Sequence, residues 1–264
     1  MNDLKAYLYG LIAVFPLAFV RAGRHGWRGC YLVFFALFFR RIPFPVMLPC
    51  LGKVGCLAEV TNIIDNLYLK ELRDDVIEKA LEEAVAPVVV DIGVNVGVSV
   101  RWWLSWNPNG RVIAIDMMDE ALSFTRERVG KVNRENHFRS VCVAVGEVDA
   151  QQEIWFDHSL EGTSSLLAKK GRQHRFVPIR TLDGIFREMK EEEILLLKID
   201  IEGYAGMALR QAKEVLAKCR YAVVEIHGRE ETRETSARLH EAGFELMHFK
   251  GRQMWWSNAA FEPK

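Results

Sequence analysis

The feature that most constrains how this chain can fold is a regular alternation of two kinds of segment from residue 87 onward. Short runs rich in β-branched residues alternate with amphipathic stretches, a pattern typical of a parallel sheet with helices on both faces. The strands are nearly all apolar, as in ILLLKI, which fits burial on both faces. We expect strands over residues 87–92, 111–116, 140–145, 194–200 and 221–227. We expect helices over residues 98–106, 119–130, 182–190, 204–218 and 230–241.

Two pairs of extended segments fall outside this alternation. Within residues 151–181, QQEIWFD and RFVPIR flank the segment EGTSSLL and predict a hairpin. At the C-terminus, FELMHFK and QMWWSN are joined by Gly251 and Arg252 and predict an antiparallel pair at the sheet edge. We therefore expect an α/β domain over residues 87–258.

The first 41 residues are apolar and basic. Their two apolar runs, AYLYGLIAVFPLAFV and CYLVFFALFF, are shorter than the roughly 20 residues of a membrane-spanning helix, and Pro16 interrupts the first. Three arrangements stay open: a segment lying in the membrane interface, a helical hairpin dipping into it, or an apolar lid packed on the main domain. Residues 42–86 form a lead-in, with an irregular or hairpin connection over 42–57 and a helical pattern over 59–85.

Lys plus Arg equals Asp plus Glu, at 35 each, and there is no basic stripe with interleaved aromatic residues. We therefore expect no nucleic-acid partner. The five cysteines contain no C-x-x-C pair and are odd in number, which favours free thiols in a reducing compartment. We expect a cytoplasmic protein that can contact the cytoplasmic face of a membrane through its basic, apolar residues 1–41.

The first predicted strand runs into the sequence VVVDIGVNVGVSV, an acid followed by a turn of small residues. Its spacing departs from G-x-G-x-x-G, because Asn95 takes the second glycine position and Val98 the third. Asp91 at the strand tip would also repel a pyrophosphate. A ligand with an ammonium group and no phosphate fits better, and S-adenosylmethionine is such a ligand. We expect Asp91 to hold its ammonium group while Gly93 and Gly97 let the backbone approach it.

The next strand ends in VIAID, which places a second acid, Asp116, one unit later at the same sheet edge. Its carboxylate can accept hydrogen bonds from both ribose hydroxyls. Met117 and Met118 can cover the adenine, and the end of the third strand, including Ala144, can form the other wall. The alternative is that Asp91 and Asp116 cap the helices that follow them.

A second group of ionisable residues follows the fourth and fifth strands, in LLLKIDIEG and YAVVEIH. For methyl transfer to a hydroxyl, His227 or Asp200 could serve as the base and Lys198 could hold the developing alkoxide. Alternatively, Lys198 and Asp200 form a buried ion pair and Glu202 starts the next helix. We expect no metal here, although Asp200, Glu202 and Glu225 could instead bind a divalent cation.

Taken together, DIGVNVG, VIAID, GTSSLL, RTLDGIF and LLKIDIEGYAGMALRQA resemble the FkbM-type methyltransferases, in the same order along residues 60–250. The resemblance implies a class I, Rossmann-like enzyme with a seven-stranded sheet that uses S-adenosylmethionine, usually for O-methylation of sugars, polyketides or glycolipids. By position it implies cofactor contacts at Asp91, Gly93, Asn95, Gly97 and Asp116. It also implies an active-edge motif, which here comprises Asp200, Glu202 and Gly203.

The chain departs from the family pattern in places. The second strand usually ends in Glu-Pro, where this chain has Asp116-Met117, and an expected glutamate is replaced by Ala205-Gly206. The expected activity is O-methyl transfer to a small-molecule or lipid-linked glycan acceptor. The alternatives are a nicotinamide-dependent oxidoreductase, a methyltransferase-fold module without activity at a membrane, and an RNA methyltransferase.

Overall fold

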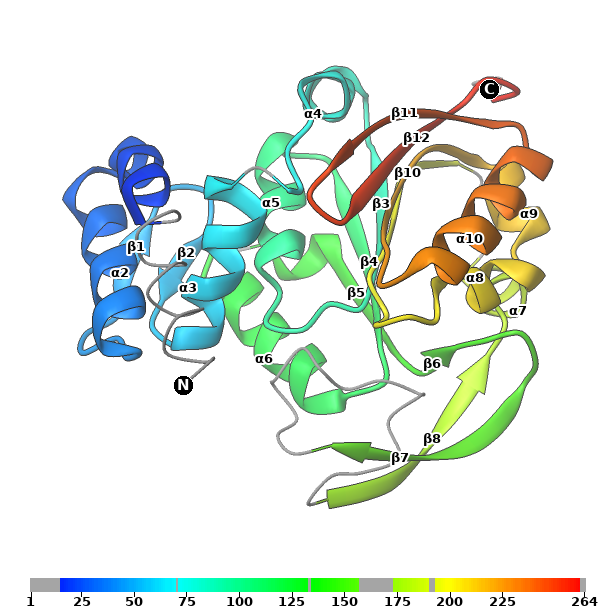
Figure 1. Cartoon of the computed structure of the whole chain (residues 1–264), viewed down its shortest axis with the longest axis horizontal. Helices are drawn as coiled ribbons and strands as arrows, with labels where there is room; N and C mark the ends of the chain where they lie inside the picture. Colours follow the sequence, from blue (N-terminus) through cyan, green and yellow to red (C-terminus); the bar gives the residue numbers. More distant parts are fainter. Residues whose placement is uncertain (1–14, 70, 133, 157–172, 190–192, 262–264) are drawn as a thin grey trace.

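A seven-stranded sheet forms the centre of the protein (Figure 1). The computed structural model describes residues 15–69, 71–132, 134–156, 173–189 and 193–261. In spatial order the strands of this sheet are β11 (Phe244–Lys250), β12 (Gln253–Asn258), β10 (Cys219–Glu225), β9 (Ile194–Ile199), β3 (Val88–Ile92), β4 (Arg111–Asp116) and β5 (Phe138–Cys142). The five from β10 to β5 are parallel, whereas β12 is antiparallel to both β10 and β11. The expected α/β class and the C-terminal antiparallel pair are thus confirmed.

One predicted strand, 140–145, is divided between two sheets. Its first part belongs to β5, but β6 (Ala144–Val145) leaves the central sheet and pairs with β8 (Gln173–Arg180). Strand β8 also pairs antiparallel with β7 (Ala150–Phe156), which confirms the predicted hairpin. Figure 1 shows this three-stranded arm projecting beyond the central sheet. The segment EGTSSLL lies outside the described residues.

The helices cover both faces of the sheet. One face packs on α4 (Asp75–Glu83), α5 (Val98–Trp106) and α6 (Asp119–Gly130). The other packs on α7 (Leu182–Met189), α8 (Ala205–Ala208), η4 (Leu209–Gln211), α9 (Lys213–Ala217) and α10 (Arg229–Glu241). A short 3₁₀ turn, η3 (Glu135–His137), precedes β5. Fully buried valines, isoleucines and leucines on the strands fill the space between the layers, as two-sided burial requires.

The helix predicted over 204–218 is broken into α8, η4 and α9. The break has a tertiary cause, because Asp183 on α7 accepts hydrogen bonds from the backbone N–H groups of Glu214 and Val215 at 3.2 and 3.0 Å. A carboxylate from another helix thus caps the first turn of α9, where negative charge is favourable.

The lead-in is also interrupted where one helix was expected over 59–85. It contains α3 (Leu57–Ile63), one π-helical turn η2 (Ile64–Tyr68) and then α4, whose N-cap Asp74 accepts from the N–H groups of Val76 and Ile77. Before α3, β1 (Val46–Leu48) and β2 (Gly52–Val54) form the short hairpin anticipated within 42–57.

The described part of the N-terminal segment, residues 15–41, packs on this lead-in in the manner of an apolar lid, one of the three expected arrangements. Residues 15–22 are helical and are followed by η1 (Gly23–His25) and α2 (Gly26–Phe39). Ala18, Leu32 and Val33 are fully buried in a cluster that reaches Val96 and Val98 of the main domain. Among the described residues, no helix has the length and apolar character needed to cross a membrane.

Candidate active site

A cavity of ≈ 320 Å³ opens at the carboxyl ends of the parallel strands, where the strand order reverses between β3 and β9. Open α/β sheets bind their ligands at this kind of switch point. The lining comes from the β3–α5 turn, the ends of β4, β5, β9 and β10, the lead-in and the β11–β12 turn. It comprises Asn62, Asp65, Asn66, Glu71, Ile92, Gly93, Asn95, Ile115, Asp116, Met117, Met118, Ala121, Val143, Ala144, Val145, Asp200, Ile201, Glu202, Tyr204, Glu225 and Arg252.

The turn after β3 has a left-handed residue at every second position: Gly93, Asn95 and Gly97 have φ values of 80°, 51° and 65°. Glycine adopts this region without strain, and asparagine tolerates it better than most residues. A Cβ on Gly93 would collide with the backbone carbonyl of Asp200, so the glycine lets two strand ends approach each other beside the cavity.

Gly97 has a different role from the expected one. It does not line the cavity, and a Cβ at this position would collide with Thr125 on α6. A glycine is therefore required at position 97 for the packing of α5 on α6. Of the three turn residues expected to contact a cofactor, the structure brings Gly93 and Asn95 to the cavity wall.

Asp116 lies at the end of β4 and organises the neighbouring turn. Its Oδ2 accepts hydrogen bonds from the N–H groups of Val94 at 2.9 Å and Asn95 at 3.2 Å, and its Oδ1 accepts from Met118 at 2.8 Å. Burial raises the pKa of this carboxyl even though these three donors oppose the shift. A carboxylate has about four acceptor positions. Asp116 as placed can therefore accept about one more hydrogen bond, which is fewer than the two expected from ribose.

Asp91 does not reach the cavity, contrary to the expectation that it holds an ammonium group. It is fully buried, and its Oδ1 lies 3.0 Å from Nζ of Lys198, its partner across the β3–β9 pair. Lys198 is also buried, lies 3.4 Å from Asp200 Oδ2 and donates to the Gly93 carbonyl at 3.0 Å. Burial alone would lower the pKa of Lys198, but Asp91 and Asp200 outweigh burial and raise it.

Lys198 does not line the cavity. Its ammonium group donates a hydrogen bond to the Gly93 carbonyl and forms ion pairs with Asp91 and Asp200. We therefore expect Lys198 to position these groups and not to hold an alkoxide. Because Lys198 compensates Asp91, which does not line the cavity, the charge of Asp91 is not the one that a ligand in the cavity would meet. A ligand would meet the charges of the cavity wall itself.

The cavity wall is strongly acidic. Among the described residues that line it, six are Asp or Glu and Arg252 is the one Lys or Arg. Burial and then the charge of Asp200 raise the pKa of Glu225 to about 7. Burial also raises the pKa values of Asp65, Glu71 and Glu202, and Asp65 adds to the effect at Glu71. Negative charge crowded in a partly dry site disfavours an anionic ligand and favours a cationic or neutral one.

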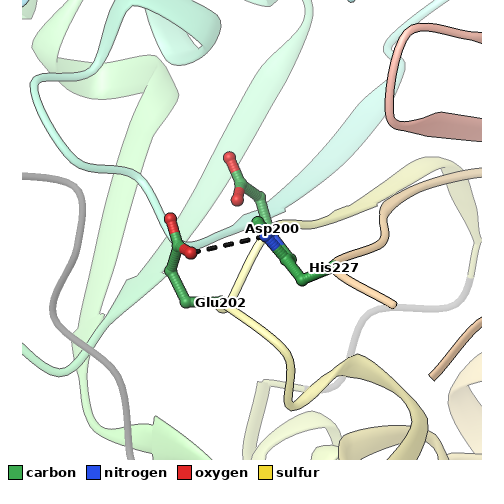
Figure 2. Close-up of side chains that lie close together, drawn as sticks. All are labelled: Asp200, Glu202 and His227. Atoms are coloured by element: carbon green, nitrogen blue, oxygen red, sulfur yellow. Dashed lines mark ion pairs between the residues drawn. The ribbon is translucent and has the colours of Figure 1, made fainter. Parts of the chain in front are cut away.

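Asp200, Glu202 and His227 converge at the ends of β9 and β10 (Figure 2). Nδ1 of His227 lies 3.5 Å from Glu202 Oε2, and its Nε2 lies 3.7 Å from Glu225 Oε1. Glu202 has φ = 43°, a left-handed conformation that is uncommon outside glycine. The sequence prediction that these two strand ends meet at one edge is confirmed. Asp200 and Glu202 line the cavity, whereas His227 does not, although one of its ring nitrogens lies within 4.8 Å of a carboxylate oxygen of each.

The remaining expected cofactor contacts, Met117 and Ala144, line the cavity together with Met118. The lead-in contributes four side chains to the cavity wall, those of Asn62, Asp65, Asn66 and Glu71. Sequence reasoning did not identify these side chains, nor Tyr204 and Arg252. The π-helical turn that presents Asp65 and Asn66 is a rare element often found at functional sites, but it leaves no sequence pattern.

The strand order, the reversed C-terminal strand pair and the acidic strand ends define a class I methyltransferase fold. The family model described as the Methyltransferase FkbM domain matches residues 91–246, and the chain belongs to this family. The family assignment therefore replaces the alternative of a nicotinamide-dependent oxidoreductase.

Three solved structures are similar to this chain at low sequence identity, and the first of them supports the fold. A methyltransferase FkbM from Methylobacillus flagellatus KT has 12% identity and a TM-score of 0.50 over 94% of this chain and 60% of that chain. The chain thus spans about 60% of that protein's length. Cofactor-bound Rv0187 from MTB has 11% identity and a TM-score of 0.45, covering 71% of this chain and 79% of that one. Aeropyrum pernix fibrillarin with natively bound S-adenosyl-L-methionine has 12% identity and a TM-score of 0.41, covering 72% and 76%. Comparison with curated proteins gives no significant match.

Proposed function

We propose that this protein is an S-adenosylmethionine-dependent O-methyltransferase acting on a hydroxyl of a sugar, glycolipid or polyketide-like small molecule. The observation that carries the proposal is the acidic cavity at the switch point of an FkbM-family sheet. An acidic wall suits a ligand that carries an ammonium and a sulfonium group and no phosphate.

The cofactor end of the cavity is the side formed by the β3–α5 turn and the end of β4. Asp116 would accept one ribose hydroxyl, and Gly93 and Asn95 would bring backbone close to the amino-acid tail. Met117, Met118 and Ala144 offer apolar and polarisable surface for the adenine. Asp91 would contribute indirectly, by holding Lys198 against the Gly93 carbonyl.

The acceptor end is the side formed by Asp200, Glu202, Arg252 and the π-helical turn. When bound, the cofactor supplies a sulfonium-activated methyl group, whose transfer to the acceptor oxygen leaves the C–S electron pair on sulfur and frees the hydroxyl proton. The chain's own task is to hold that oxygen in line and to receive the proton. Asp200, Glu202 and His227, which lie close together at this end, would serve for both.

We further propose that the acceptor is a small molecule or a lipid-linked glycan, reached at the cytoplasmic face of a membrane. The lid supports this, because α2 exposes Trp27, Phe34 and Phe38 and is flanked by exposed Arg24 and Arg28. Exposed aromatic residues beside arginines suit an anionic lipid surface. No nucleic-acid partner is proposed.

The first prediction concerns cofactor binding. In calorimetry with the full chain, we expect S-adenosylmethionine and S-adenosylhomocysteine to bind and NADH not to bind. Asp116→Ala should weaken cofactor binding by at least about tenfold, because it removes an acceptor and also the partner of three turn N–H groups.

The control is Asp119→Ala, which removes a carboxylate from the first turn of α6 outside the cavity. We expect it to retain cofactor affinity. NADH binding in place of S-adenosylmethionine, or unchanged affinity in a folded Asp116→Ala protein, would refute the assignment. Incubating cell extracts with labelled cofactor would then identify the acceptor.

A further inference from the structure

Two carboxylates and an imidazole meet beside the cavity, an arrangement that methyl transfer by itself does not require. One ligand-type atom from each of Asp200, Glu202 and His227 lies within 4.8 Å of the other two. Asp200 and Glu202 follow β9, and His227 follows β10, the strand that pairs with β9 (Figure 2). All three are partly buried, so they face a site that is neither bulk solvent nor core.

His227 is held in place but its ring is poorly satisfied. Its backbone N–H donates to Glu231 Oε2 at 2.7 Å, which fixes the residue at the start of α10. Its Nε2 is buried and has no hydrogen-bond partner among the described residues. The carboxylate oxygens beside both ring nitrogens, at 3.5 and 3.7 Å, are farther than good hydrogen bonds allow. The nitrogen that faces Glu202 is Nδ1, so an ion bound by Glu202 would meet this nitrogen of the ring.

The ion pairs of Glu225 and Lys198 indicate which of the neighbouring side chains belong to the cluster. Glu225 is engaged elsewhere, because it pairs with Arg252 at 2.6 Å and accepts from Gln253 at 2.7 Å. The sequence-based alternative of Asp200, Glu202 and Glu225 as cation ligands is therefore revised, with His227 in place of Glu225. Lys198 lies closer to Asp91 than to Asp200, which leaves Asp200 only partly compensated.

We infer that Asp200, Glu202 and His227 bind a divalent cation of the Mn²⁺ or Mg²⁺ type. Carboxylate oxygens suit these ions, and one imidazole favours a first-row transition ion such as Mn²⁺ among them. Neighbouring ligands of an octahedral ion with metal–oxygen bonds of about 2.1 Å lie about 3 Å apart, so ligand atoms that lie within 4.8 Å of one another have to move inward to bind it.

The cation site would add a step to the proposed function, and this step rests on that function. A cation beside the acceptor end of the cavity can bind the acceptor hydroxyl and lower its pKa. The hydroxyl proton then leaves to water, its oxygen forms the new C–O bond, and the C–S electron pair stays on sulfur. With a cation bound, His227 acts as a ligand in place of the base predicted from the sequence.

Titration of the full-length protein with MnCl₂ tests the site. The electron paramagnetic resonance signal of free Mn²⁺ measures how much is bound, and we expect one strong site per chain. Asp200→Asn and His227→Gln should each weaken Mn²⁺ binding by at least about tenfold. Excess Mg²⁺ should compete. Circular dichroism of each variant verifies that it is folded.

The matched control is His174→Gln. His174 also lies beside a carboxylate, with Nδ1 2.6 Å from Glu153 Oε1, but on the exposed arm and without a third ligand. We expect this variant to bind Mn²⁺ as the unmodified protein does. In a proton–carbon spectrum of the histidine rings, Mn²⁺ should broaden the His227 signal before that of His174.

The outcomes separate the two proposals. Mn²⁺ binding that depends on Asp200 and His227 supports the cation site even if S-adenosylmethionine does not bind, in which case only the proposed function fails. If S-adenosylmethionine binds but Mn²⁺ does not, the cation site is wrong and the methyltransferase proposal stands. Mn²⁺ binding unaffected by the Asp200 and His227 variants, or broadening that starts at His174, also overturns the site.

Discussion

At the scale of single residues, Lys198 is the buried charge on which the site's geometry depends. It joins Asp91 on β3, Asp200 at the end of β9 and the carbonyl of Gly93 in the turn. Asp91 is fully buried, and Lys198 is its only described cationic partner. Removing one member of such a pair leaves the other charged and buried without a counter-charge. The resulting loss of stability is far larger than the stability that the pair itself contributes.

We therefore expect Lys198→Met to destabilise the protein by about 3–5 kcal/mol in urea unfolding. The double variant Asp91→Asn/Lys198→Met should recover a large part of that loss, because it removes both charges together. The matched control is Lys79→Met, whose ion pair with Glu83 is exposed and should change stability by less than about 0.5 kcal/mol. Equal stability of the Lys198 and Lys79 variants would contradict this account.

At the scale of elements, a buried ionic network attaches the lead-in to the main domain. Glu59 on α3 is fully buried and receives Arg101 of α5 and Arg128 of α6, each at 2.9 Å. Arg101 also donates to the carbonyls of Leu51 and Lys53 beside the β1–β2 hairpin. The network thus holds the helix that leads into the π-helical turn, and with it one wall of the cavity.

Replacing Glu59 should uncouple these elements. We expect Glu59→Gln to destabilise the protein by about 3–5 kcal/mol, because two guanidinium groups lose their counter-charge in a buried site. Urea unfolding measures the change. The exposed Glu82→Gln is the control and should stay within about 0.5 kcal/mol of the unmodified protein. A Glu59→Gln protein as stable as this control would show that the network does not join the segments.

The same residue predicts a pH dependence. Burial alone would raise the pKa of Glu59, but Arg101, the Gly55 N–H and Arg128 outweigh burial and hold the pKa below its usual value. The stabilisation is fully present above the unfolded-state pKa of about 4.3 and is lost as the pH falls through the lower folded-state pKa. Urea midpoints measured down to acidic pH should fall less steeply in Glu59→Gln. An identical slope in both proteins would contradict the assignment.

At the scale of the whole molecule, the lid has one packed face and one exposed apolar face. Helix α2 buries Leu32 and Val33, whereas Trp27 is 70% exposed and the rings of Phe34 and Phe38 lie 5.1 Å apart on the same side. Residues 27, 34 and 38 share a helix face because they are seven and four positions apart. We propose that this face is the one that contacts a lipid surface.

We expect the full-length protein to sediment with vesicles that contain anionic phosphatidylserine and less with neutral vesicles, an effect that salt should weaken. Trp27→Ser/Phe34→Ser should reduce sedimentation, whereas Phe176→Ser, which removes an equally exposed phenylalanine from the arm, should not. Deleting residues 1–41 is a poor test, because it would uncover the apolar cluster beneath the lid. No vesicle binding by the unmodified protein would rule out the contact.

The alternation of strands and helices, the antiparallel C-terminal pair and the acids at the strand ends were all readable from the sequence. They depend on local periodicity and on chain order, which decide where each parallel strand ends and which edge it reaches. The element boundaries of β4, α5 and α6 agree with those expected. The meeting of Asp200 and His227 at one edge follows from the same reasoning.

Only the tertiary structure decided which strand-end acids face the cavity and which are neutralised. Asp91 and Asp116 look alike in sequence, yet Asp91 is paired with Lys198 and Asp116 lines the cavity. The helix break before α9 likewise depends on Asp183 from another helix. These outcomes arise from contacts between residues far apart in the chain, and burial sets the cost of each charge, so no local pattern could reveal them.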